Sequence, residues 1–285
     1  MEETRFENHM LAPLLAKKPV IMGVVNVTPD SFSDGGDFYN YNKAIEHGLS
    51  LFRNGAAILD IGGESTRPGA QPVEVEEEIE RVVPVVKALS EDVPYLSVDT
   101  RNAETMRAAL NAGANIINDI SALTHDDEAL NVIVEYKVPV CLMHMQGEPK
   151  TMQDAPSYKY VVTDIIDYFS DLIKKYETFG LSKNQIVLDP GIGFGKTLEH
   201  NLLILSNIKE FHKIGCPLLL GVSRKSFIGK LCGDVPASER LPGSLAAALW
   251  GVSQAVQIFR VHDVAETAQA FKVFTAISDY LPKTE

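Results

Sequence analysis

The sequence is poor in cysteine and in long apolar runs, and each shortage excludes a class of protein. Cys141, Cys216 and Cys232 are an odd number and lack C-x-x-C spacing, which argues against a disulfide framework or a structural zinc site and favours a reducing cytoplasm. No apolar run approaches the roughly 18 residues that span a bilayer. Residues 1–18 carry mixed charge instead of a basic stretch followed by an apolar one, so we expect no secretory signal.

Positive charge is also scarce. The chain has 26 basic against 38 acidic residues, which gives a formal net charge of −12. A surface of this sign repels nucleic acid and anionic membranes, so neither is expected as a partner. Any phosphate group that the protein handles must therefore meet a local cluster of basic side chains.

Four common catalytic signatures are missing. Residues 22–34 lack the G-x-G-x-x-G dinucleotide fingerprint, and a phosphate-loop pattern at residues 190–197 fails because Pro190 stands where its first glycine is required. No pair of histidines has H-E-x-x-H spacing, and no serine lies in G-x-S-x-G. The sequence thus argues against dinucleotide, nucleotide, zinc and acyl-enzyme chemistry.

What the chain does have is a regular alternation of eight short apolar runs with amphipathic helical patterns. Continuous Val, Ile and Leu runs of this length are typical of parallel strands buried on both faces. The predicted strands are residues 20–28, 56–62, 95–100, 115–121, 138–145, 186–189, 217–223 and 257–261. The predicted helices are residues 42–54, 75–89, 102–111, 127–136, 160–179, 198–213, 239–255 and 264–280.

Eight strand-helix units are enough to close a ring. We therefore predict the α/β class and a single (β/α)8 TIM-barrel domain over residues 1–285, a length that such barrels commonly reach. An open doubly wound sheet is the alternative architecture, but its dinucleotide fingerprint is missing. In a TIM barrel the active site lies at the C-terminal ends of the strands.

Each predicted strand ends at a side chain that can hydrogen-bond, carry charge or bind a metal. The barrel would direct these side chains into one pocket. They are Asn26, Asp60, Asp99, Asn118, His144, Asp189, Lys225, and Arg260 with His262.

Two carboxylates, one amide and one lysine in this set predict a site for a flat heterocycle. A carboxylate can accept two parallel N–H bonds from an amidine-like edge, and a lysine can donate to a ring carbonyl. Taken singly, each could instead cap a helix. The four residues are Asp99, Asn118, Asp189 and Lys225.

A second group predicts an anion site. Arg260 and His262 lie on the same side of one predicted strand, and Asp263 with Glu266 fits a capping box at the helix that follows. A helix N-terminus beside an arginine fork suits a phosphate or pyrophosphate leaving group. A structural salt bridge of Arg260 next to a half-buried His262 remains the alternative. Asn26 is a candidate ligand for Mg²⁺ held mainly by phosphates and water.

Two long predicted loops, residues 29–41 and 63–73, are rich in Gly, Ser, Asp and Pro. Long loops at the mouth of a barrel often close over the substrate as lids. Solvated surface loops are the plainer alternative.

Seven segments, in order along nearly the whole chain, resemble the motifs of the dihydropteroate synthase family. The most specific is Met-Gly-Val-Val-Asn-Val-Thr-Pro-Asp-Ser-Phe-Ser-Asp-Gly-Gly at residues 22–36. The others are residues 63–69, 97–100, 117–119, 188–191, 221–227 and 260–263.

The resemblance implies that 6-hydroxymethyl-7,8-dihydropterin pyrophosphate is condensed with 4-aminobenzoate to give dihydropteroate and pyrophosphate. It also implies Mg²⁺ and a homodimer formed through the late helices. The pterin is implied to bind Asp99, Asn118, Met143, Asp189, Phe194, Gly221 and Lys225. Pyrophosphate is implied to bind Asn26, Arg260 and His262, with Asn26 also at the metal. The 4-aminobenzoate site, where sulfonamides bind, is implied to consist of Phe32, Thr66, Arg67, Pro68 and Ser226.

Loss of pyrophosphate leaves a methylene cation that a pterin delocalises, so no protein nucleophile is needed. The enzyme has to stabilise the departing anion and exclude water. The predicted catalytic residues are Arg260, His262, Lys225 and Asp34, the last facing the developing cation. Two alternatives remain: a methyltetrahydrofolate-dependent methyltransferase, which needs a corrinoid partner, and a non-catalytic pterin-binding protein.

Overall fold

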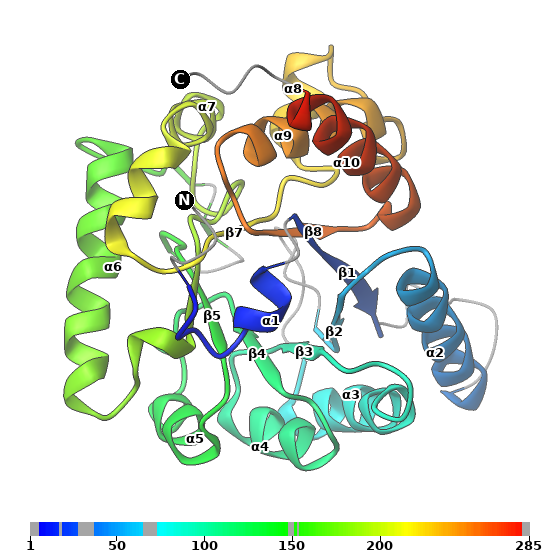
Figure 1. Ribbon diagram of the computed structural model, residues 1–285. Helices are drawn as coiled ribbons and strands as arrows, with labels where there is room; N and C mark the ends of the chain where they lie inside the picture. The colour runs from blue at the N-terminus through cyan, green and yellow to red at the C-terminus, as the bar shows by residue number, and fades with distance from the viewer. Residues whose placement is uncertain are drawn as a thin grey trace.

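The computed structural model describes residues 6–16, 19–27, 37–64, 73–147, 151–152 and 154–280, and of residues 37–40 the backbone only. Eight parallel strands and their helices form a (β/α)8 barrel, as predicted (Figure 1). Each strand lies within its predicted segment. The strands are β1 Val20–Asn26, β2 Ile58–Gly62, β3 Leu96–Asp99, β4 Ile116–Asp119, β5 Val140–Met143, β6 Ile186–Asp189, β7 Leu219–Leu220 and β8 Ile258–Val261.

Hydrogen-bonded neighbours run in the order β6, β5, β4, β3, β2, β1, β8, β7. The ring is completed between its two ends by one parallel bridge, Leu188 to Leu218. The backbone N–H of Leu188 also donates to the carbonyl oxygen of Pro217, at 2.9 Å. The joint between β6 and β7 therefore has far less backbone pairing than the other joints.

Helices surround the strands where the apolar periodicity predicts them. They are α2 Asp37–Arg53, α3 Val75–Leu89, α4 Ala103–Asn111, α5 Ala129–Tyr136, α6 Val161–Thr178, α7 Leu198–Ser206, α9 Leu241–Ser253 and α10 Val264–Asp279. No helix in the described ranges is both long enough and apolar enough to cross a membrane.

Three details differ from the sequence prediction. The helix predicted over residues 198–213 ends at Ser206: the backbone of Asn207 leaves the helical region at φ −113° and ψ 20°, its side-chain amide donates to the carbonyl of Leu203 at 2.9 Å, and a 3-10 helix, Ile208–Ile214, follows. Residues 37–41 of the first predicted loop belong to α2. The short helices α1, Ala12–Leu15, and α8, Ser226–Leu231, were not predicted, since each is too short to show a helical period.

Side chains of each strand alternate between the barrel interior and the helices. Leu59 and Ile61 of β2 belong to the outer apolar core, whereas Ile58 clusters with the interior residues Met22 and Ile116. By the same alternation Asp60 points into the barrel, where none of its surface is exposed. Polar side chains thus follow apolar ones towards the C-terminal ends of the strands.

The N-terminal segment fills the opposite end of the barrel. Figure 1 shows α1 over the centre of the ring of strands, and its side chains cluster with the interior residues at the strand starts. Nε2 of His9 lies 3.1 Å from the carbonyl oxygen of Ile186, which fastens this segment to β6. The buried apolar residues of the segment are Phe6, Leu11, Leu14 and Leu15. A ligand must therefore enter from the C-terminal ends of the strands.

Candidate functional site

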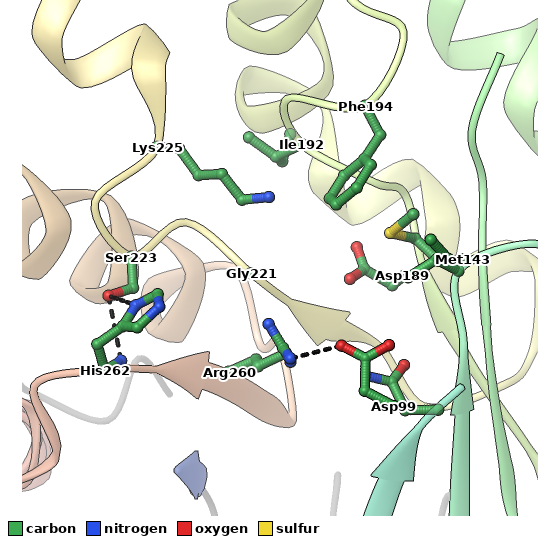
Figure 2. A pocket seen from close by; sticks show the side chains of 12 residues that line it. Asp99, Met143, Asp189, Ile192, Phe194, Gly221, Ser223, Lys225, Arg260 and His262 are labelled. Carbon is green, nitrogen blue, oxygen red and sulfur yellow. Dashed lines mark hydrogen bonds and ion pairs between the residues drawn. The ribbon is translucent and has the colours of Figure 1, made fainter. Parts of the chain in front are cut away.

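A pocket lies at the C-terminal ends of the strands (Figure 2). It brings together all seven residues assigned by resemblance to the pterin and two of the three assigned to pyrophosphate. Asp189 and Arg260 therefore face the same space. The lining residues are Asp99, Asn118, Ile120, Met143, Asp189, Ile192, Phe194, Gly221, Ser223, Lys225, Arg260 and His262.

One side of the pocket combines an acceptor with apolar surface. Asp189, Met143 and Phe194 lie together there (Figure 2). Oδ1 of Asp189 accepts a 2.7 Å hydrogen bond from the backbone N–H of Gly191, which fixes the carboxylate. Gly191 has φ +70°, and a Cβ at this position would lie 2.0 Å from the His144 carbonyl oxygen, so the turn requires glycine.

Space in front of Asp189 depends on a second glycine. A Cβ at Gly221 would lie 3.8 Å from Asp189 Oδ2, where a larger side chain would occupy the pocket. Burial raises the pKa of Asp189, while the hydrogen bond from Gly191 and the charge of Lys225 lower it. The free oxygen is thus available to the N–H groups of a planar ring.

Lys225 faces the same space from the N-cap of α8. Its Nζ lies 4.0 Å from the centroid of the Phe194 ring, a cation–π distance. Burial lowers its pKa to about 8, against the opposing effect of the Asp189 carboxylate. At neutral pH this lysine is mostly a cation that can donate to a ring carbonyl.

The guanidinium of Arg260 lies between two carboxylates. Nε donates to Asp60 Oδ2 at 2.6 Å, and Nη2 donates to Asp99 Oδ2 at 2.7 Å. Burial opposes its charge, but Asp60 and Asp99 raise the pKa of Arg260 above its ordinary value. The sequence predicts a fork open to phosphate oxygens; in the structure Nε and Nη2 carry ion pairs to Asp60 and Asp99, so Nη1 is the guanidinium nitrogen without an ion pair to a described residue.

Asp99 is a carboxylate whose protonated and ionised forms are close to balance at neutral pH. Burial raises its pKa to about 7, Arg260 lowers it, and the like charges of Asp60, Glu78 and Asp119 raise it again. Asp99 therefore ionises within the physiological range. Asp99 lines the pocket and also pairs with Arg260. Its charge therefore acts both on a heterocycle bound in the pocket and on an anion bound to Arg260.

His262 is neutral at physiological pH. Burial and the neighbouring charge of Arg260 lower its pKa to about 4. Ser223 Oγ lies 3.0 Å from His262 Nδ1 and accepts from the backbone N–H of His262 at 3.2 Å. In the tautomer in which the Ser223 hydroxyl donates to Nδ1, Nε2–H is the ring donor left for a ligand.

The predicted capping box of Asp263 and Glu266 is wrong. Asp263 is the N-cap of α10, but its side chain makes no cap hydrogen bond. Its carboxylate instead pairs with Arg224, whose Nε donates to Oδ2 at 3.0 Å and whose Nη2 also bonds Oδ1. The guanidinium is the stronger partner because both groups are charged.

The other predicted site residues lie at the rim or beyond the described residues. Asn26 ends β1 and is partly exposed, and Ser226 is exposed at the start of α8, next to Lys225. Most of the predicted lid segments, residues 28–36 and 65–72, lie outside the described residues. With them lie Phe32, Asp34, Thr66, Arg67 and Pro68.

Sequence reasoning gave no role to three residues at or beside the pocket. Asp60 was noted only as a strand end, and Ser223 carried no motif of its own. Lys196, from the rejected phosphate loop, is buried and donates to the carbonyl oxygens of His144 and Phe194 at 3.1 and 2.9 Å. It braces the loop that carries Phe194. A buried lysine can be recognised only after the loop is folded.

Comparisons with known proteins agree with this pocket. A family described as pterin binding enzyme matches residues 22–262. A dihydropteroate synthase of Escherichia coli K12 is 50% identical over 259 residues, 90% of this chain and 91% of that one. A Yersinia pestis dihydropteroate synthase solved with a sulfonamide drug has 48% identity and TM-score 0.86, covering 92% and 94% of the two chains. A Xanthomonas albilineans dihydropteroate synthase solved with 4-aminobenzoic acid has 44% identity and TM-score 0.87, covering 93% and 95%.

Proposed function

Because this chain belongs to the dihydropteroate synthase family of pterin-binding enzymes, we propose that it condenses 6-hydroxymethyl-7,8-dihydropterin pyrophosphate with 4-aminobenzoate. The products are 7,8-dihydropteroate, a folate precursor, and pyrophosphate, so the enzyme is a transferase. The observation that carries the proposal is one pocket in which the ring acceptors Asp99 and Asp189 adjoin the anion donors Arg260 and His262.

In this proposal the pterin lies against Met143 and Phe194. Asp189 and Asp99 accept from its N–H groups, and Lys225 donates to its carbonyl. Gly221 leaves the space that the ring needs. Asn118 completes the pterin site.

The chemistry consists of leaving-group stabilisation. The C–O bond to pyrophosphate breaks with its electron pair, which leaves a methylene cation conjugated with the pterin. Arg260, the Nε2–H of His262 and the first turn of α10 donate to the departing anion. The aniline nitrogen then attacks the methylene carbon, a C–N bond forms, and the nitrogen releases its proton to solvent. We assign Asp34 to the developing positive charge.

We propose that a Mg²⁺ ion is held mostly by the pyrophosphate group of the substrate and only in small part by the protein. Among them no three His, Cys, Asp or Glu side chains form a metal-binding group, whereas Mg²⁺ often takes one or two protein oxygens and completes its shell with phosphates and water. Asn26 would supply one oxygen. A bound ion there would neutralise charge on the pyrophosphate.

The 4-aminobenzoate is proposed to bind at the rim. Ser226 starts α8 directly after Lys225 and is exposed, so it lies next to the pterin pocket. The family resemblance assigns the remaining residues of this site to the two long predicted loops, residues 29–41 and 63–73. They are Phe32, Thr66, Arg67 and Pro68. Support also comes from the relative solved with 4-aminobenzoic acid.

The decisive experiment measures pyrophosphate release with the dihydropterin pyrophosphate, with and without 4-aminobenzoate and Mg²⁺. Stoichiometric dihydropteroate and pyrophosphate, dependent on both substrates and suppressed by a chelator, are expected. Pterin binding without turnover would identify a non-catalytic binding protein. Activity only with methyltetrahydrofolate and a corrinoid partner would identify the methyltransferase.

The pH dependence of kcat/KM is expected to be bell-shaped. Activity should rise as Asp99 loses its proton near pH 7, because the ionised carboxylate pairs with Arg260, and fall as Lys225 loses its proton near pH 8. Initial rates from pH 5.5 to 10 measure both limbs. In Lys225→Arg, which stays charged, the alkaline limb should move to higher pH; an unmoved limb would remove Lys225 from the assignment.

We further propose a homodimer formed through the late helices. Exposed apolar side chains gather on α7, α9 and α10, including Trp250 at 46% exposure, and Trp250 Nε1 donates to Leu205 O at 2.8 Å, which joins α9 to α7. Surface of this kind marks protein interfaces. The others are Leu202, Leu203, Val273 and Ile277.

Sedimentation equilibrium is expected to give about twice the chain mass of 31.3 kDa. Trp250→Glu should shift the protein to the monomer, because a charge in an apolar interface is left without a partner. Phe179→Glu, at an exposed aromatic at the end of α6, serves as the matched control and should leave the mass unchanged. Equal masses for wild type and Trp250→Glu would contradict this interface.

A cytoplasmic location is part of the same proposal. All three cysteines are free, with Cys141 and Cys216 buried and Cys232 exposed. Free thiols are typical of proteins in a reducing compartment.

A further inference from the structure

Asp60 lies directly beneath the pocket without lining it. It is the third residue of β2, pairs in register with Ser97 of β3, and has none of its surface exposed. Twelve other residues form the pocket wall. Asp60 therefore lies behind the pocket wall and contacts two of the residues that form it, Arg260 and Asn118.

A single oxygen of Asp60 accepts hydrogen bonds from both halves of the site. Oδ2 takes Nε of Arg260 at 2.6 Å and Nδ2 of Asn118 at 3.0 Å. Arg260 comes from β8 and Asn118 from β4, on opposite sides of β2 in the strand order. Asp60 thus connects the anion donor with a member of the pterin wall.

Burial makes this arrangement costly for the fold. The second oxygen, Oδ1, has no hydrogen-bond partner among the described residues, and neither does the nearby Ser97 Oγ. A buried carboxylate that leaves an oxygen unpaired adds little to stability. The two partners of Oδ2, Arg260 and Asn118, point to a role at the site.

We propose that Asp60 is a positioning residue for the condensation: it holds Arg260 so that Nη1 faces the pyrophosphate, and it fixes the Asn118 amide. Because Asn118 donates its Nδ2 to Asp60, its Oδ1 is presented to the pterin as an acceptor. This inference rests on the proposed function and adds a residue that acts only through others.

Removing the bond to Asp60 would change both partners. Without it, Arg260 would be free to place both Nε and a terminal nitrogen on Asp99, a bidentate pair that turns the guanidinium towards the pterin wall. Asn118 would lose the contact that determines which end of its amide enters the pocket. Positioning errors of about 1 Å commonly cost about 10²-fold in rate.

The charge of Asp60 also acts on Asp99. The charged groups that act on the pKa of Asp99 are Arg260, which lowers it, and Asp60, Glu78 and Asp119, which raise it; the Lys225 ammonium also interacts with Asp99, which raises the pKa of that lysine. Replacing Asp60 with a neutral group of the same shape removes one of the three like charges. The pKa of Asp99 should then fall.

The test compares Asp60→Asn with Asp60→Ala and with Ser97→Ala as the matched control. Ser97 is buried in the same layer on the paired strand but bonds to neither Arg260 nor Asn118. Asp60→Asn keeps an acceptor and loses the charge, so its acid limb of kcat/KM should move to lower pH. Asp60→Ala loses the acceptor as well, and its kcat should fall about 10²-fold. The KM for 4-aminobenzoate should stay unchanged in both.

A purely structural role would lower the melting temperature of these variants and leave their pH profiles and rate constants per folded molecule at wild-type values. That outcome would overturn the proposal. So would a Ser97→Ala enzyme whose pH profile and kcat change as much as those of the Asp60 variants. Calorimetric binding of inorganic pyrophosphate separates it from the proposed function. A wild-type chain that binds pyrophosphate but does not condense the dihydropterin pyrophosphate with 4-aminobenzoate would refute the synthase assignment, while weakened pyrophosphate binding in Asp60→Ala would still support positioning.

Discussion

Replacing Arg260 with alanine is expected to lower kcat/KM for the condensation by about a thousandfold, which corresponds to ~4 kcal/mol of transition-state stabilisation. Arg260 is the charged donor that faces the leaving group from the pocket wall. The leaving pyrophosphate develops its negative charge in a largely buried site, where one well-placed donor stabilises it more than the same donor would in water. Alanine supplies no substitute.

The same substitution should also destabilise the fold. Asp60 and Asp99 would lose the cation that both contact, and breaking a buried pair on one side typically costs about 3–5 kcal/mol. Thermal unfolding followed by circular dichroism gives the folded fraction for which the rates are corrected. Arg107→Ala, which removes a surface ion pair to Glu135, is the control and should change neither quantity much. Wild-type turnover in Arg260→Ala would remove this residue from the mechanism.

Asp189→Asn is expected to weaken dihydropterin binding about 100-fold, or ~3 kcal/mol, with little change in fold stability. A carboxylate can accept two N–H bonds from the ring edge, whereas an amide offers one acceptor and places a donor against the second N–H. The asparagine oxygen still accepts from Gly191, and the fold no longer buries a charge. Calorimetric titration with 6-hydroxymethyl-7,8-dihydropterin measures the dissociation constant.

Asp119→Asn provides the converse control. Asp119 also ends a barrel strand and is fully buried, but its oxygens accept from Ser121 and Leu123 in the turn outside the pocket. Measured at about pH 8, where Asp99 is mostly ionised, its substitution should lower the melting temperature and leave dihydropterin affinity unchanged. If Asp189→Asn retained the wild-type dissociation constant, the pterin would have to bind elsewhere.

The sequence predicts the barrel because its strands follow a simple physical rule. In β2, Leu59 and Ile61 face the helices and Ile58 faces the barrel interior, so the strand is apolar on both faces of the sheet, and parallel strands end at the same edge of the ring. The convergence of Asp99, Asn118 and Asp189 follows from that edge alone. No knowledge of individual side-chain contacts is needed to place them in one pocket.

Side-chain contacts between strands that are distant in the sequence could not be predicted from the sequence. The pair Asp60 and Arg260 is 200 residues apart and forms only after β2 and β8 close on either side of β1. Arg224 reaches Asp263 over 39 residues, and this competition removed the capping box that local spacing favoured. Local rules predict what a residue can do; closure of the fold decides which partner it meets.

The sparse pairing between β6 and β7 has a consequence for the ligand. Asp189 lies at the end of β6, while Gly221 and Lys225 follow β7, so a heterocycle held from both sides bridges the weakest joint of the wall. A substrate bound there would add hydrogen bonds across the joint between β6 and β7, where the backbone has one parallel bridge. Ligand binding would then stabilise the closed barrel, and its melting temperature would rise with ligand concentration.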